Sequence, residues 1–94
     1  MVRHIVMFKF EDQTKIEKAK ELLLSMNGNV PTAKNIVVGV DFLHSARSYN
    51  LYLAVDVENK QALEEYQNDR YHCSVVKTYM HEHATSSVAI DFEL

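Results

Sequence analysis

Three segments of this 94-residue chain are apolar at consecutive positions, namely residues 5–8, 36–38 and 51–55. A strand with one face in water alternates between apolar and polar residues, whereas an apolar run indicates a strand that is covered on both faces. The chain must therefore form a sheet with cover on both sides. This requirement restricts the possible architectures more than any other property of the sequence.

The hydrophobic periodicity predicts six elements in the order β-α-β-β-α-β. We expect strands at residues 2–10, 35–42, 49–57 and 85–92, with helical regions at residues 14–26, 59–68 and 71–80. The last two regions count as one helical element, which Asn68 and Asp69 should interrupt. The second and third strands are expected to form a hairpin around a polar loop at residues 44–48.

Local signals mark the ends of the helical regions. Thr14 and Glu17 have the spacing of a capping box at the start of the first helix. Gly28 follows that helix and is suited to the left-handed backbone of a helix end. Asn59 is a favourable N-cap for the second helical region.

This order of elements is the split βαβ pattern of ferredoxin-like α+β folds, in which helices cover one face of a four-stranded antiparallel sheet. We expect one domain over residues 1–94. The other face of the sheet is apolar, and no segment of the chain remains to cover it. A second copy is the simplest cover, so we predict a homodimer in the form of a dimeric α+β barrel.

Charge and cysteine usage exclude several classes of protein. The net charge is −3 and the cationic residues form no basic run, which argues against nucleic-acid binding. Cys73 is the single cysteine, so no internal disulfide can form and a reducing, cytoplasmic location is expected. We expect neither a signal peptide at the N-terminus nor a membrane-spanning segment.

Three polar residues are the candidates for chemistry. His4 lies on the first strand, and Tyr66 and His72 lie on the interrupted helical region that should pack over the same face of the sheet. A histidine and a tyrosine that meet in an apolar pocket can transfer a proton near pH 7, with the histidine as base and the tyrosine as acid or polarising donor. Such a site needs neither a metal nor an organic cofactor. Alternatively, the three side chains are structural or partly exposed.

We expect the pocket between sheet and helices to hold a small hydrophobic ligand. The side chains expected to contact the ligand are Val6, Phe8 and Met26.

Several short motifs resemble those of the stress-responsive A/B barrel (Dabb) family. They occur in order at residues 2–10, 35–39, 63–66, 72–76 and 91–92. The resemblance covers nearly the whole chain and implies a dimeric α+β barrel. The chain differs from the family pattern at residues 69–72, where a His-Pro-x-His motif is common.

One plant branch of that family contains a polyketide cyclase, which closes a linear poly-ketone chain by intramolecular aldol condensation. The resemblance implies a keto-containing ligand. It also implies that His72 removes a proton next to a carbonyl, that Tyr66 polarises the ketone and that His4 orients its partners. Where the cyclase has a further histidine in its third strand, this chain has Leu51.

Other interpretations remain open at this point. A second interpretation is a non-catalytic ligand-binding or stress-associated dimer, and a third, by analogy of fold alone, is a cofactor-independent monooxygenase. His81 and His83 would share a face on a strand and hold a metal with a third ligand, but a solvated turn is the preferred interpretation. Cys73 is expected to be a buried thiol.

Overall fold

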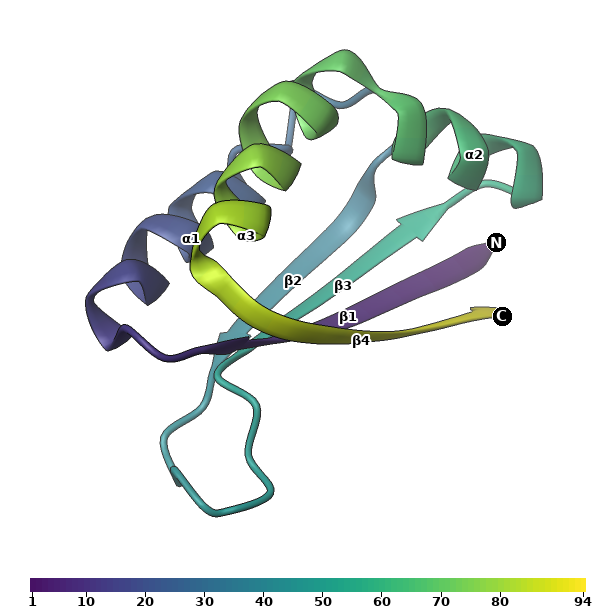
Figure 1. Ribbon diagram of the computed structural model, residues 1–94. Coiled ribbons are helices and arrows are strands. Elements are labelled where there is room, and N and C mark those ends of the chain that lie inside the picture. Colours follow the sequence, from purple (N-terminus) through teal and green to yellow (C-terminus); the bar gives the residue numbers. More distant parts are fainter.

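The computed structural model describes residues 1–94 and places one layer of helices over one face of a four-stranded antiparallel sheet (Figure 1). The elements are β1 (Val2–Phe10), η1 (Gln13–Lys15), α1 (Ile16–Leu24), β2 (Lys34–Val40), β3 (Leu51–Val57), α2 (Lys60–Asn68), η2 (His72–Lys77), α3 (Thr78–His83) and β4 (Ala84–Glu93). The predicted ferredoxin-like α+β fold is confirmed.

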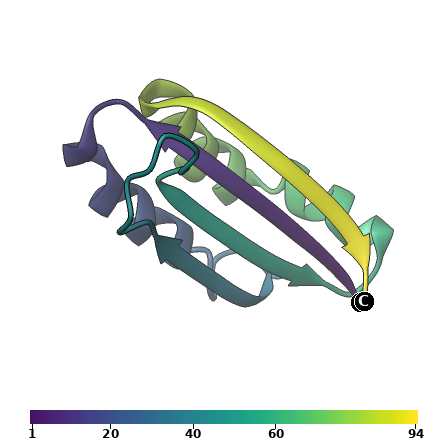
Figure 2. The same cartoon turned by 90° about the horizontal axis from the view of Figure 1, so that it is seen from below.

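The strand order β2-β3-β1-β4 puts the first strand beside the last one, as the split βαβ pattern requires. In this register His4 lies opposite Val55 on β3 and opposite Asp91 on β4. Because side chains alternate along a strand, these three residues share the face of the sheet that the helices cover. The other face is free of helices, which all lie behind the sheet in Figure 2.

The first helical region begins differently from the prediction. Asp12 caps η1 by accepting hydrogen bonds from the backbone N–H and the hydroxyl of Thr14, at 3.0 and 2.6 Å. The Thr14 hydroxyl is therefore a donor to Asp12, and α1 starts only at Ile16. The predicted capping box of Thr14 and Glu17 is wrong.

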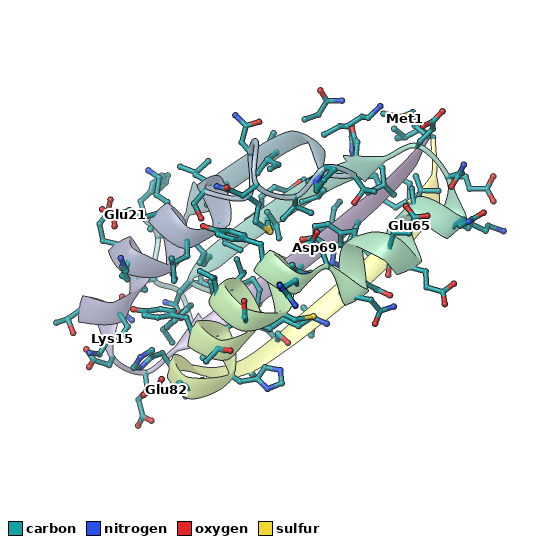
Figure 3. The ribbon with its side chains drawn as sticks, turned by 90° about the horizontal axis from the view of Figure 1, so that it is seen from above. Met1, Lys15, Glu21, Glu65, Asp69 and Glu82 are labelled. Carbon is teal, nitrogen blue, oxygen red and sulfur yellow. The ribbon has the colours of Figure 1, made fainter.

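The second helical region is interrupted where the sequence predicted. Asn59 caps α2 by accepting a 2.8 Å hydrogen bond from the Ala62 N–H, and α2 ends before Asp69. The chain then resumes as the π-helix η2 and continues as α3. Figure 3 shows Asp69 at this break, in the middle of the helical layer.

The β2–β3 hairpin is shorter in its strands and longer in its loop than predicted. β2 ends at Val40 and β3 begins at Leu51, while Phe42, expected in a strand, is 82% exposed in the loop. Asp41 accepts a 2.7 Å hydrogen bond from the His44 N–H, so the chain turns before Phe42 can extend the ladder. The loop projects beyond the end of the sheet in Figure 1.

The core lies between the sheet and the helices. The largest wholly buried apolar side chains come from both layers and include Leu23, Met26, Leu51, Leu53, Val55 and Val76. The turn after α1 requires Gly28, whose φ of +87° is unfavourable for residues with a Cβ. No helix is long and apolar enough to cross a membrane.

Candidate functional site

His4, Tyr66 and His72 form one aromatic cluster at the centre of the helix-covered face. The rings of Tyr66 and His72 are stacked, with centroids 4.4 Å apart, and the His4 ring meets Tyr66 edge-on at 5.6 Å. All three residues are nearly inaccessible, with 8% of His4, 0% of Tyr66 and 7% of His72 exposed. The structure therefore brings together the three residues that the sequence predicted to meet.

The break in the second helical region positions the two helical members of the cluster. Tyr66 lies in the last turn of α2, and His72 is the first residue of η2. Asp69 holds the second piece in place, because its side chain accepts a 3.0 Å hydrogen bond from the His72 N–H. Isolated π-helical turns often occur at functional sites, where they redirect side chains.

Both imidazoles use Nδ1 for a structural hydrogen bond. His72 Nδ1–H donates to the backbone carbonyl of Tyr66 at 2.9 Å, and His4 Nδ1 is hydrogen-bonded to a carboxylate oxygen of Asp91. Neither Nε2 has a hydrogen-bond partner, and the one buried side-chain polar atom without a partner is Thr32 Oγ1. Each ring consequently keeps Nε2 open to the adjacent space and available to accept a proton.

Burial acts differently on His72 and Tyr66. It lowers the pKa of the His72 imidazole, because the protonated ring would lose its water, so the neutral, basic form is favoured. It raises the pKa of the Tyr66 phenol for the same reason. The Tyr66 hydroxyl donates to Met26 Sδ at 3.6 Å, a weak acceptor within the core. This hydroxyl reaches a ligand only if it first leaves Met26.

A cavity of about 680 Å³ lies next to the cluster, between the helices and β4. Its sixteen lining residues include the three members of the cluster and apolar side chains such as Phe8 and Val76. The remaining polar lining residues are Gln67, Asn68, Lys77, His81, Ser86 and Ser87. The volume is in the usual range for small-molecule sites, about 300 to 1,000 Å³.

The side chains expected to contact a ligand divide into two groups. Val6 and Phe8 line the cavity. Met26 does not, because it is completely buried in the core, where its Sδ accepts a hydrogen bond from the Tyr66 hydroxyl. Met26 lies in the turn after α1 and faces the core instead of the cavity.

The expectations for the His81–His83 pair and for Cys73 need correction. His81 and His83 lie in α3, not in a turn or a strand, so residues two positions apart point in different directions. His81 lines the cavity, whereas the His83 ring packs on Tyr79 at 4.4 Å. Cys73 is half-buried, and its Sγ contacts the Gln67 carbonyl at 3.2 Å.

Asp91 and Lys77 are residues of the site that the sequence pattern did not reveal. Asp91 comes 87 residues after His4, and only the β1–β4 register makes them neighbours. The available signal was the presence of acidic residues, Asp91 and Glu93, at alternate positions near the end of the last strand. Lys77 follows His72 by five residues, the spacing of a π-helical hydrogen bond, and a π-helical segment is not predictable from the sequence pattern.

A family model described as "Stress responsive A/B Barrel Domain" (Dabb) matches residues 2–94. The chain belongs to this family. The match confirms the resemblance inferred from the short motifs, and it includes every member of the aromatic cluster. No curated protein has a significantly similar sequence.

Solved structures agree with the Dabb fold. A dimeric ferredoxin-like protein of unknown function from Thermobifida fusca has a TM-score of 0.85 and 23% identity, over 99% of this chain and 90% of that one. A protein from Arabidopsis thaliana has a TM-score of 0.84 and 20% identity, over 100% and 95%. A hydroxynitrile lyase from Passiflora edulis has a TM-score of 0.78 and 14% identity, over 99% and 92%. At these identities the likeness establishes the fold alone.

Proposed function

We propose that this Dabb protein is an enzyme that transfers a proton at a carbon next to a ketone, without a cofactor, as the first step of an aldol-type ring closure like that of a polyketide cyclase. The observation that supports this most is a pair of imidazoles that line one cavity, each held through Nδ1 and each with an Nε2 that has no hydrogen-bond partner. Held in this way, the rings need little reorganisation when a substrate binds.

In this proposal His72 is the base. Its Nε2 takes the proton from the carbon next to the ketone, and the electrons of that C–H bond form the enolate. His4 acts in this step as an imidazolium with both ring nitrogens protonated: Nε2–H donates to the ketone oxygen, and Nδ1–H donates to Asp91. The enolate carbon then attacks a second carbonyl of the same molecule, and the new alkoxide takes back the proton from His72.

The role that we propose for Tyr66 differs from the one predicted by the sequence. Its ring packs between the two imidazoles and its hydroxyl is directed to Met26, so we propose that it orients the histidines instead of acting as the acid. The same sequestered hydroxyl favours a second candidate function, a dimer that binds a ligand without turning it over.

We also propose that the active form is a homodimer whose subunits pack their helix-free sheet faces together. This face exposes apolar side chains on three strands, including Val37 on β2, Met7 on β1 and Ile90 on β4. At one end, the charge of Arg3 is offset by Asp56, with Nε and Oδ1 2.8 Å apart, so this end of the face can be covered without an unpaired ion. The similarity to a dimeric protein from Thermobifida fusca supports this arrangement.

Deuterium exchange into acetophenone tests the proposed chemistry. This neutral ketone has one enolisable methyl group, and NMR in D₂O follows the loss of its methyl protons. We expect the protein to accelerate exchange and the His72→Ala variant to lose about 10²-fold or more of that rate. His44→Ala is the matched control, because His44 is exposed in the β2–β3 loop and does not line the cavity. Equal rates with the two variants would contradict the role of His72 and favour the binding dimer.

A further inference from the structure

The lining of the cavity has a charge that differs from that of the whole chain. The sequence contains 13 acidic residues against 10 lysines and arginines, yet none of the sixteen lining residues is acidic. The lining instead contains Lys77 together with three histidines. The two nearby carboxylates are already engaged, Asp91 with His4 and Asp69 with the His72 N–H.

Lys77 provides the one permanent positive charge at the cavity. Its Nζ donates a 2.9 Å hydrogen bond to the Gln67 carbonyl at the end of α2, which leaves two N–H donors of the ammonium group free. His81 lies one α-helical turn further along and also lines the cavity. On the opposite wall, Ser87 of β4, which pairs with the inward-facing Phe8, adds a hydroxyl donor.

From this arrangement we infer that the ligand of the cavity carries a carboxylate, which binds against Lys77 while its ketone faces His72 and His4. A keto acid of moderate size is thus the class of substrate. The inference rests on the cavity being the ligand site, as in the proposed function, but it does not depend on turnover.

The spacing and the amount of charge both fit this class. His72 and Lys77 are the first and last residues of η2 and both line the cavity, so one ligand of moderate size can face both groups. One ammonium group balances one negative charge. A phosphate dianion would leave a second negative charge without a permanent partner in a partly desolvated cavity.

Three probes of similar size separate the alternatives. 4-Acetylbenzoate carries the carboxylate, 4-acetylbenzamide is its neutral isostere, and 4-acetylphenyl phosphate is a dianion. Their dissociation constants are measured by NMR titration of the full chain. We expect the benzoate to bind about tenfold more tightly than the amide, and this difference to shrink at high salt. The phosphate should bind no more tightly than the benzoate.

Variants of Lys77 assign the effect to this residue. Lys77→Met should bring the benzoate-to-amide ratio close to one without weakening the amide, and Lys77→Arg should restore the preference because it keeps the charge. Lys18→Met is the control, since Lys18 is exposed on α1 and does not line the cavity. Melting curves verify that each variant is folded. A purely structural role of the bond to Gln67 would change stability but not the ratio.

The possible failures are distinguishable. Equal affinity for benzoate and amide, a preference that survives Lys77→Met, or tighter binding of the phosphate would each overturn the carboxylate assignment. If the benzoate preference depends on Lys77 but no deuterium enters the acetyl group of any probe, the ligand class stands and the proposed proton transfer fails.

Discussion

Tyr66 contributes a ring to the site and a hydroxyl to the core, and the two can be separated by mutation. Tyr66→Phe removes a hydroxyl whose one partner is Met26 Sδ, so the free energy of unfolding should change by less than about 1 kcal/mol. The exchange rate should fall by less than about tenfold, below the range typical of a lost acid. Tyr66→Ala removes the ring as well and should cost about 3 kcal/mol or more. Thermal melts and acetophenone exchange check both results; a 10²-fold slower Tyr66→Phe would restore the tyrosine as the acid.

The pH dependence of stability provides a second test of a single residue, because burial lowers the pKa of His72 in the folded protein. The unfolded chain takes up a proton at His72 as the pH falls through about 6.5, whereas the folded chain does not until a lower pH. The free energy of unfolding should therefore decrease as the pH falls through this window, and the acid limb of the exchange rate should lie below pH ~6.5. Denaturation and exchange measured across this range test both signs. His72→Ala should reduce the pH dependence of stability; an acid limb above that pH would contradict the assignment.

At the scale of elements, the break between α2 and η2 links stability to the geometry of the site. Asp69 and Asn59 both cap helical segments, but only Asp69 holds the residue that carries the proposed base. Asp69→Ala and Asn59→Ala should each lower the free energy of unfolding by about 1 kcal/mol. Only Asp69→Ala should also slow proton exchange, because it releases the His72 N–H. Chemical denaturation and exchange rates measured on both variants decide this, and equal exchange rates would show that the break does not position His72.

For the whole molecule, the helix-free face of the sheet determines the state of assembly. Ile90 on β4 is 59% exposed in a single chain, so Ile90→Asp should leave the subunit folded but place an unpaired carboxylate in the interface. We expect sedimentation at micromolar concentration to give twice the chain mass for the natural sequence and a shift to monomer for the variant. Leu24→Asp is the control, because Leu24 is an exposed apolar residue on α1, away from the sheet. A natural protein that sediments as a monomer would contradict the dimer.

Much of this architecture follows from short-range patterns. Alternation along residues 2–10 correctly separates the buried His4, Phe8 and Phe10 from the outer face, and the cap at Asn59 is correct because its bond reaches only to Ala62. The errors occur where two local signals compete. Thr14 is both a possible cap and a possible donor, and the presence of Asp12 two residues earlier made it a donor.

The sequence by itself determined the order of the elements, the faces of the strands, the interruption near Asp69 and the set of three residues that meet, since all of these depend on periodicity and on caps within a few positions. The tertiary structure alone decided how those residues are used. The pairing of His4 with Asp91 depends on the register of two strands far apart in the chain, and the direction of the Tyr66 hydroxyl depends on the packing of Met26 beneath it. The charge of the cavity was likewise visible only after folding, because Lys77 reaches it through a π-helical turn. Register, packing and helix type are set by contacts between distant segments, and a local pattern carries no information about them.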